Sequence, residues 1–179
     1  KEGVEVRVLY DGMNTVSNLP HDYPKILKSK GILCRVFNPV RPAISTSQNT
    51  RDHRKILIID GTIAYTGGVN LADEYINEYE RFGYWMDSAA IIKGDAVESF
   101  LAMFCASWEF ATSKPIDMQS HMAVGDVIND HFALPYSDDP LNNENPAEGI
   151  YMQILNSAQK YVYITTPYLI IDSSMITTL

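Results

Sequence analysis

Residues 51–75 read RDHRKILIIDGTIAYTGGVNLADEY, and this stretch decides the fold. The apolar run 56–59 is followed by Asp60, by Gly61-Thr62 and by a second short run at 63–66, which predicts a β-hairpin. Because every position of the first run is apolar, we expect that strand to be buried on both faces.

Outward from the hairpin, the sequence alternates strand and helix patterns. Residues 4–10 alternate apolar and polar side chains, which predicts a strand, and residues 95–110 have apolar side chains at helical spacing. The other expected elements are helices at 24–30, 70–77 and 150–158 and strands at 32–37, 84–92 and 161–165. This order predicts the α/β class, with a mixed β-sheet flanked by helices.

A polar connector at 137–149, SDDPLNNENPAEG, divides the chain. Residues 1–136 are expected to form a first unit. Residues 150–179 are expected to be the opening helix and strand of a second unit. The chain begins and stops within such elements, so we expect it to be part of a longer protein.

Composition narrows the function classes. The net charge is −8 and no basic stripe is visible, which disfavours nucleic acid as a partner. Cys34 and Cys105 lie in apolar surroundings without metal-ligand spacing, so we expect buried, reduced thiols and a reducing compartment. We expect no metal site, because His21, His121 and His131 are scattered. No run approaches the roughly 20 apolar residues of a membrane span, so the chain itself is expected to be soluble.

His53 and Lys55 are the candidate catalytic pair. On a strand, residues two apart point to the same face, so they should share a surface, whereas Asp60 should point away. Lysine can neutralise the oxygens of a phosphate, and imidazole can attack phosphorus or transfer a proton. The pairing therefore suits phosphate chemistry.

The glycines and Asn70 after the hairpin extend this pattern. Gly67 and Gly68 allow close approach of the backbone to a ligand. Asn70 precedes the expected helix 70–77 and can act as its N-cap, with Asp73 completing a capping box. Its amide and the helix N-terminus can also bind an anion. The two interpretations are compatible.

This pattern of histidine, lysine, aspartate, paired glycines and asparagine resembles the HKD signature of the phospholipase D superfamily. The segments VRVLYDG (6–12), RVFNP (35–39), GGVN (67–70) and ITTPYLIID (164–172) are similar to those of bacterial cardiolipin synthases. The similarity covers nearly the whole chain. It implies half of a phospholipase D-like α/β/α sandwich.

Members of this family carry two HKD motifs, one in each half, and this chain carries the first. The resemblance places the opening strand of the second half at 161–166. One hypothesis is that this strand completes the sheet of the first half, in the position of an N-terminal strand that would precede Lys1.

The resemblance also implies residue roles. His53 is either the nucleophile that forms a phosphohistidine or the acid that protonates the leaving glycerol. The implied phosphate-binding residues are Lys55, Gly67, Gly68 and Asn70. Asp60, the third residue of the motif, is implied to be structural. Asp87 is the candidate carboxylate that orients the histidine, and Met86 stands where the family usually has arginine.

The implied reaction joins two phosphatidylglycerol molecules into cardiolipin and glycerol, without cofactor or metal. The implied partners are the membrane surface and a second HKD half, from the parent chain or a homodimer partner, at a bacterial cell membrane. A phosphodiesterase or nuclease of the same superfamily is the nearest alternative, and an inactive, dimerising scaffold is another. Tyr75, Tyr79 and Tyr84 are expected to pack at a domain edge, with lipid headgroup contact as the alternative.

Overall fold

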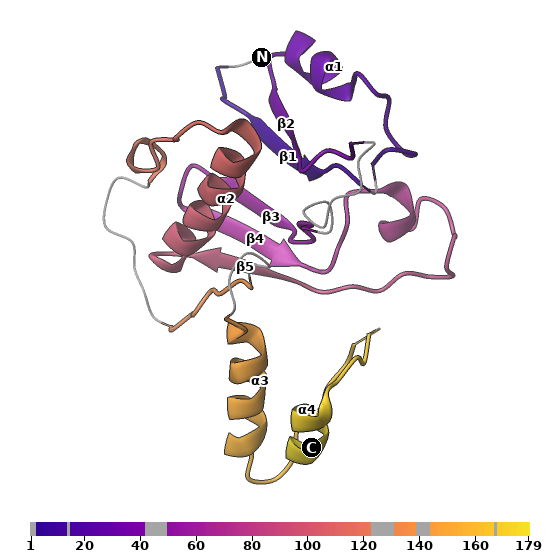
Figure 1. Ribbon diagram of the computed structural model, residues 1–179, viewed down its shortest axis with the longest axis vertical. Coiled ribbons are helices and arrows are strands. Elements are labelled where there is room, and N and C mark those ends of the chain that lie inside the picture. The colour runs from indigo at the N-terminus through magenta and orange to yellow at the C-terminus, as the bar shows by residue number, and fades with distance from the viewer. Residues whose placement is uncertain (1–2, 14, 42–49, 123–130, 139–143, 167) are drawn as a thin grey trace. The chain divides into compact units, whose positions relative to one another are not determined.

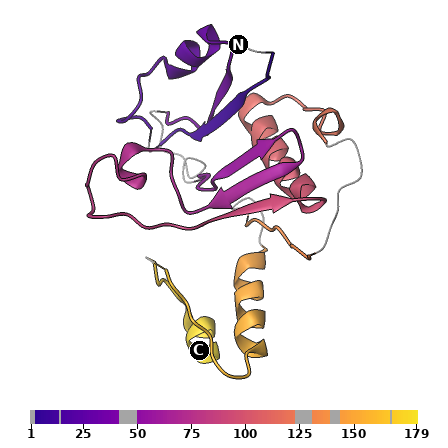
Figure 2. The same cartoon turned by 180° about the vertical axis from the view of Figure 1, so that it is seen from behind.

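The computed structural model describes residues 3–13, 15–41, 50–122, 131–138, 144–166 and 168–179 (Figure 1, Figure 2). The chain forms two compact units, Lys1–Pro135 and Tyr136–Leu179. Of the helices in the described ranges, none has the length and apolar character that crossing a bilayer requires.

The first unit opens with a strand, a helix and a parallel strand. These are β1 (Arg7–Asp11), α1 (Tyr23–Ser29) and β2 (Leu33–Phe37), and the two strands pair along their full length. Gly31 follows the helix in the left-handed conformation, with φ 82°, which glycine adopts at low cost. The predicted strand–helix–strand order is confirmed.

Three further strands form an antiparallel sheet in the order β3-β4-β5. They are β3 (Ile56–Ile59), β4 (Ile63–Gly67) and β5 (Ala89–Lys93). Asp60 and Gly61 join the first two with φ 51° and 64°, and a backbone hydrogen bond of 3.0 Å closes the turn. Positive φ at both central positions defines a type I′ turn, whose twist matches that of the strands. The predicted hairpin is confirmed.

Helix α2 (Ala96–Thr112) covers one face of this antiparallel sheet and also contacts β2 (Figure 1). Val97 and Phe100 of the helix pack against Ala64 of β4 at the centre of the core. The partly buried side chains around this centre are Ile56, Ile58, Ile92 and Met103. The predicted long helix is therefore confirmed, and its apolar face is buried against the hairpin.

The opposite face of the antiparallel sheet is open. Leu57 and Ile59 of β3 are 56% and 40% exposed, and Ile91 of β5 is 60% exposed. The prediction that β3 is buried on both faces is wrong. The reason is that, among the described elements of this unit, α2 alone packs on the sheet, and a helix can cover only one face.

The second unit contains α3 (Pro146–Ser157) and α4 (Ser173–Thr178). Helix α3 begins inside the predicted connector, because proline is favoured in the first turn of a helix. Residues 139–143 of that connector lie outside the described residues. The side chain of Asp172 caps α4 by accepting a hydrogen bond from the Met175 backbone N–H at 2.8 Å.

The strand predicted at 161–165 does not form. The described strands pair only as β1-β2 and β3-β4-β5, so residues 161–166 belong to neither sheet. A strand exists through its ladder with a neighbour, and this segment has none among the described residues. Completion of the first sheet by this segment is not observed.

Candidate active site

Segments that carry predicted site residues meet at one end of the antiparallel sheet. Lys55 directly precedes β3, Gly67 is the last residue of β4, and Asp87 lies just before β5. Because β4 runs antiparallel to both neighbours, its end lies beside the beginnings of β3 and β5, and Gly67 pairs with Ala89. This end of the sheet is the candidate active site.

His53 lies on a segment that is anchored to the first sheet. The backbone N–H of Asp52 donates to Asp11 Oδ2, at the end of β1, at 3.2 Å. The amide of Asn38, after β2, donates to the carbonyl oxygen of Thr50 at 2.8 Å. The imidazole of His53 is exposed and forms no hydrogen bond or ion pair with the described residues. Its ring nitrogens are therefore accessible for attack or proton transfer.

Lys55 contacts His53 through the backbone. Strand β3 begins at Ile56, so both residues precede it and strand parity does not determine their directions. Instead, Lys55 Nζ donates a hydrogen bond to the carbonyl oxygen of His53 at 2.7 Å. The ammonium group is thereby held next to the histidine backbone.

The surroundings of Lys55 combine burial with nearby negative charge. Burial lowers the pKa of Lys55 below its ordinary value of 10.5, and the carboxylates of Asp87 and Asp52 act in the opposite direction. Partial removal from water strengthens the interaction of this cation with an anion. A phosphate oxygen placed here would meet a fixed, partly desolvated charge.

Asp52 and Arg54 flank His53 and form a clamp with α2. Arg54 Nε donates to Asp52 Oδ1 at 2.9 Å and Arg54 Nη2 to Asp52 Oδ2 at 2.7 Å. The same Nη2 donates to Ser107 Oγ at 2.6 Å. Burial raises the pKa of Asp52, but the hydrogen bonds and charge of Arg54 outweigh it and hold this pKa below its usual value. The sequence reasoning missed this clamp, although opposite charges on both sides of a histidine were a signal for it.

Gly67 and Gly68 pack closely against the beginning of β5. The N–H of Gly68 donates to the carbonyl oxygen of Ser88 at 3.1 Å. A Cβ atom on Gly67 would overlap the backbone of Ser88 and Ala89, and one on Gly68 would overlap the carboxylate of Asp87. Neither glycine has a positive φ. Close packing, and not backbone conformation, is thus what excludes a side chain here.

The carboxylate of Asp87 is held by its neighbours in sequence. It accepts hydrogen bonds from Trp85 Nε1 at 3.1 Å and from the Ser88 N–H at 2.7 Å. It forms no hydrogen bond with His53, which is the contact that the resemblance implies. Its charge acts on Lys55 instead.

Asn70 does not begin a helix. Residues 70–77 contain only the single 3-10 turn η2 (Asp73–Tyr75), which has Ala72 at its N-cap and no side-chain cap. The predicted helix, the capping role of Asn70 and the anion site at a helix N-terminus are therefore wrong.

Asn77 and Trp85 hold the chain in a loop instead. The Asn77 side chain accepts from the Trp85 N–H at 2.7 Å and donates to its carbonyl oxygen at 3.0 Å. Asn77 itself has φ 61°. These bonds also explain why the strand predicted from residue 84 begins only at Ala89.

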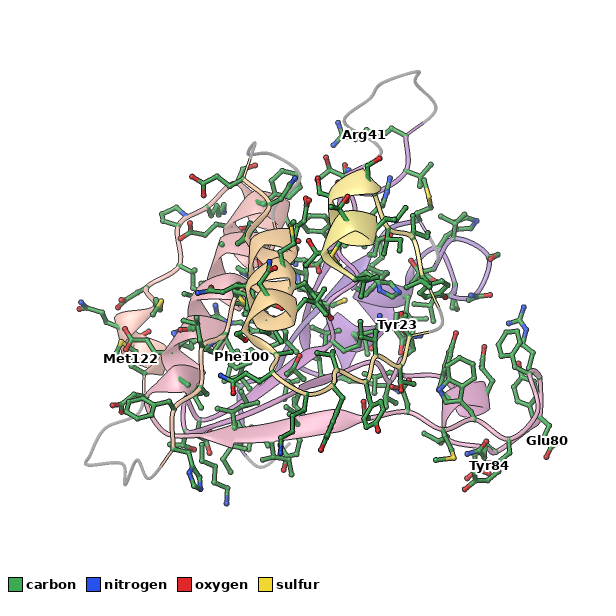
Figure 3. All side chains as sticks on the ribbon, turned by 90° about the horizontal axis from the view of Figure 1, so that it is seen from below. Tyr23, Arg41, Glu80, Tyr84, Phe100 and Met122 are labelled. Carbon is green, nitrogen blue, oxygen red and sulfur yellow. The ribbon has the colours of Figure 1, made fainter. Side chains whose placement is uncertain are left out.

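The loop between β4 and β5 exposes large apolar side chains next to the site. They are Leu71, Ile76, Tyr79, Phe82, Tyr84 and Met86. Figure 3 shows Glu80 and Tyr84 at the outer end of this loop. Tyr75 packs edge-on against Trp85, with ring centroids 4.9 Å apart, as expected for a packing tyrosine. Tyr79 and Tyr84 are 50% and 75% exposed, so edge packing does not describe them.

Asp60 lies away from this cluster. It occupies the turn at the other end of β3, so the length of that strand, ~16 Å from Lys55 to Asp60, separates the two residues. Its side chain is exposed and forms no hydrogen bond or ion pair with described residues. Aspartate is one of the few residues that tolerate positive φ, which accounts for its presence in the turn.

The cysteines behave as expected. Both Cys34 and Cys105 are buried free thiols, and burial raises the pKa of each. Within the described part of the chain, no three histidine, cysteine, aspartate or glutamate side chains gather as a metal ion would require.

Comparison with known proteins identifies the family of this chain. A family model for the cardiolipin synthase, PLD-like domain matches residues 1–105. A cardiolipin synthase of Oceanobacillus iheyensis is 38% identical over 178 residues, covering 97% of this chain and 36% of that protein. One from Halalkalibacterium halodurans is 33% identical over 182 residues, with 100% and 36% covered. An uncharacterized protein of Streptococcus mutans is 50% identical over 177 residues, with 98% and 38% covered.

The chain belongs to the family of cardiolipin synthase PLD-like domains. It spans little more than a third of the length of these relatives.

Proposed function

We propose that this chain supplies one half of the active site of a phospholipase D-type phosphatidyltransferase, which converts two phosphatidylglycerol molecules into cardiolipin and glycerol. The observation that carries the proposal is the meeting of Lys55, Gly67-Gly68 and Asp87 at one sheet end, beside the accessible imidazole of His53. This cluster combines a nucleophile or acid with a fixed cation and a close-approaching backbone.

The reaction has two displacements at one phosphorus atom. A histidine nitrogen attacks the first phosphatidylglycerol, so an N–P bond forms while the P–O bond to glycerol breaks and the glycerol oxygen takes a proton. The hydroxyl of a second phosphatidylglycerol then attacks, loses its proton and breaks the N–P bond. His53 is one of the two histidines that serve as nucleophile and acid.

The other residues support the phosphate group. Lys55 neutralises non-bridging oxygens as negative charge concentrates on them. Gly67-Gly68 pack closely against Ser88 and Asp87, and this backbone forms a wall of the proposed phosphate site. Half-buried Asn70, two residues after the glycines, is placed to donate its side-chain amide. The negative charge of Asp87 favours the protonated form of Lys55. Asp60 has a structural role, in the turn between β3 and β4.

One histidine cannot perform both roles in the same displacement. We propose that the second histidine comes from a second HKD half, contributed by the rest of the parent chain or by a second copy. The fraction of the relatives that this chain spans supports this division, because two such halves fit within their length.

The lipid substrate is supported by the loop between β4 and β5. Its exposed aromatic side chains, Tyr79, Phe82 and Tyr84, resemble the amphipathic rings that gather at membrane interfaces. We propose that this loop meets the membrane surface of a bacterial cell. The net charge of −8 does not favour a nucleic acid substrate.

The test uses the full-length parent protein in phosphatidylglycerol vesicles, with resolved lipid products. Wild type should form cardiolipin and glycerol, and His53→Ala should lose at least about 10³-fold in rate. His21→Ala, an exposed histidine remote in sequence, is the matched control and should behave as wild type. Equal activity of His53→Ala and wild type would overturn the proposal, as would cleavage of labelled DNA without any lipid product.

Reactions with phosphorus-labelled lipid, quenched with denaturant at mildly alkaline pH to preserve the acid-labile N–P bond, separate the two roles of His53. Label bound to a peptide that contains His53 identifies it as the nucleophile. In His53→Ala, loss of turnover together with accumulation of label on another histidine identifies His53 as the acid.

A further inference from the structure

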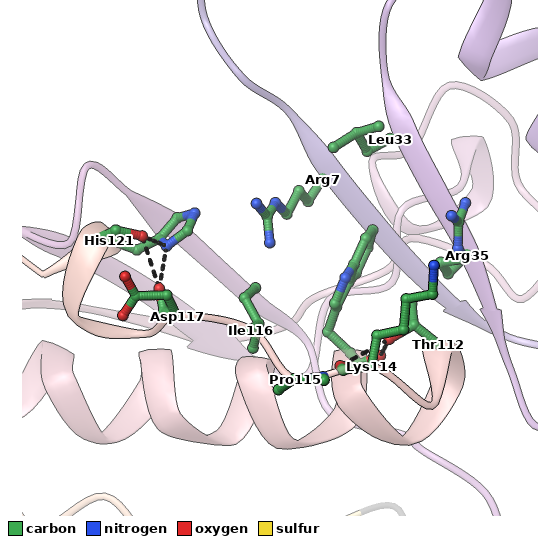
Figure 4. A pocket seen from close by; sticks show the side chains of 11 residues that line it. Arg7, Leu33, Arg35, Thr112, Lys114, Pro115, Ile116, Asp117 and His121 are labelled. Carbon is green, nitrogen blue, oxygen red and sulfur yellow. Dashed lines mark hydrogen bonds between the residues drawn. The ribbon is translucent and has the colours of Figure 1, made fainter.

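A polar cavity lies in the first unit. It has a volume of about 430 Å³ and opens between the two parallel strands, the end of α2 and the segment after that helix (Figure 4). The polar and aromatic residues that line it include Arg7, Arg35, Trp108, Lys114, Asp117 and His121.

The lining is cationic in a chain that is acidic as a whole. Arg7, Arg35 and Lys114 carry permanent positive charges, and among the lining residues Asp117 alone carries a carboxylate. Arg7 also pairs with Glu5 just outside the cavity, at 2.6 Å. Arg35 and Lys114 form no ion pair with any described residue, so their charges are not neutralised by the protein.

The two arginines are positioned by one buried indole. Trp108 is 7% exposed, and the guanidinium carbons of Arg7 and Arg35 lie 5.6 and 5.9 Å from its ring centroid. Arg7 Nε donates to Glu5 and Arg35 Nη1 donates to the carbonyl oxygen of Cys34 at 2.7 Å. Stacking and these bonds restrict the guanidinium groups, and their remaining N–H groups can donate to an anion. In Figure 4, the side chain of Lys114 extends toward that of Arg35, whereas Arg7 lies on the other side of the drawn cluster.

The cavity also has an apolar part. Leu33, Pro115 and Ile116 line it beside the indole of Trp108. A bare inorganic ion would leave this surface unused, whereas an organic phosphate can place its carbon atoms there. The planar forks of arginine match phosphate oxygens in pairs, which favours phosphate over a monodentate anion.

The cavity is separate from the candidate active site. Arg7 is the first residue of β1, and Asp11, which holds the segment carrying His53, is the last. Strand geometry places about 13 Å between these ends.

We propose that this cavity binds the phosphate group of an organic phosphate, which is either a small phosphomonoester or the headgroup of an anionic phospholipid. The proposal does not depend on the function proposed above, because it uses none of the residues at the sheet end.

The two tryptophans allow a direct test. The full chain, labelled with ¹⁵N at its indoles, is titrated with glycerol 3-phosphate, and the Nε1–H signal of Trp108 is assigned by its loss in Trp108→Phe. The signal should shift and saturate. The Trp85 indole, which donates to Asp87, reports on the candidate active site, so binding there is recognised separately.

Matched variants decide the outcome. Arg35→Gln with Lys114→Gln should weaken the Trp108 titration at least about tenfold, as expected from losing two charge-assisted contacts. Lys25→Gln with Lys28→Gln makes the same charge change on exposed positions of α1 and should have no effect. An unmoved Trp108 signal together with no selective binding to phosphatidylglycerol vesicles, or equal weakening in both double variants, would overturn the proposal.

A second arm identifies the source of the phosphate. Co-sedimentation compares phosphatidylglycerol vesicles with phosphatidylcholine vesicles for the same variants. Binding that is selective for phosphatidylglycerol and is lost only in the Arg35/Lys114 variant identifies a lipid headgroup. A Trp108 response to glycerol 3-phosphate without such vesicle binding identifies a soluble phosphomonoester. Either result supports the site.

Discussion

Replacement of Gly68 by alanine tests how the candidate active site is assembled. A Cβ atom at this position would overlap the carboxylate of Asp87. Since the backbone of Gly68 does not have a positive φ, alanine introduces no conformational strain of its own. The overlap can be relieved only if the Asp87 side chain moves away from Trp85 Nε1 and the Ser88 N–H.

The magnitude follows from those two hydrogen bonds. Bonds to a charged group contribute about 1.5–3 kcal/mol each, and the exposure of Asp87 places them at or below the lower end. We therefore expect Gly68→Ala to lower the free energy of unfolding of the first unit by about 1–3 kcal/mol. The control Gly149→Ala lies in α3 with open space around it and should stabilise that helix by about 0.5–1 kcal/mol.

Denaturant unfolding monitored by tryptophan fluorescence measures Gly68→Ala, because both tryptophans lie in the first unit. Far-UV circular dichroism follows the helix that contains Gly149. A double-mutant cycle with Asp87→Ala isolates the contact, because Gly68→Ala should cost less once the carboxylate is absent. The reasoning fails if Gly68→Ala stays within about 0.5 kcal/mol of wild type, the range of ordinary surface substitutions. It also fails if the cost is the same with and without the Asp87 carboxylate.

Three further predictions concern charges and the turn. Asp60→Asn should keep wild-type stability, because asparagine also tolerates positive φ, whereas Asp60→Val should lose roughly 1–2 kcal/mol in the same unfolding assay. For Lys55, NMR titration should give a pKa below 10.5, and Asp87→Asn should lower that pKa further by removing an opposing charge. Between the depressed pKa and 10.5, the unfolded chain binds more protons at Lys55 than the folded chain, so the stability of the unit should rise with pH in this range. Asp52→Asn should remove a stabilisation that is present above the ordinary pKa of 3.8 and disappears as the pH falls through the depressed folded value, so that the stabilities of variant and wild type converge in acid.

The parts of the fold that the sequence predicted are those with local causes. The Asp60-Gly61 dipeptide fixes a type I′ turn by itself, and Gly31 ends α1 by its own conformation. The wrong predictions concern segments whose structure depends on residues that are not their immediate neighbours in the chain. Residues 70–77 are kept out of a helix by the bonds between Asn77 and Trp85, which no periodicity reveals. The segment 161–165 has a strand pattern, but pattern alone does not provide a neighbouring strand.

In the candidate site, too, the features with local causes were predicted and those that depend on distant residues were not. The spacing of His53 and Lys55 predicted that the two residues lie together. They do, but through a hydrogen bond from Lys55 Nζ to the backbone carbonyl oxygen of His53, and not because their side chains share a strand face. The clamp that fixes His53 was not predictable in full, because Ser107 lies 53 residues from Arg54 and is brought there only by the packing of α2. Side chains whose partners are distant in sequence need the tertiary structure to be recognised.

The clamp and the free imidazole together clarify what this half contributes. Asp52 and Arg54 are fixed to each other and to α2, so the backbone on both sides of His53 is held while its ring has no partner among the described residues. Asp87, the carboxylate that the resemblance implies for orienting that ring, already accepts from Trp85 and Ser88. A carboxylate has further acceptor capacity, so these two bonds do not by themselves prevent it from accepting from His53. If it does not, the group that sets the tautomer of His53 must come with the second half, and the proposed active site would be complete only across that interface.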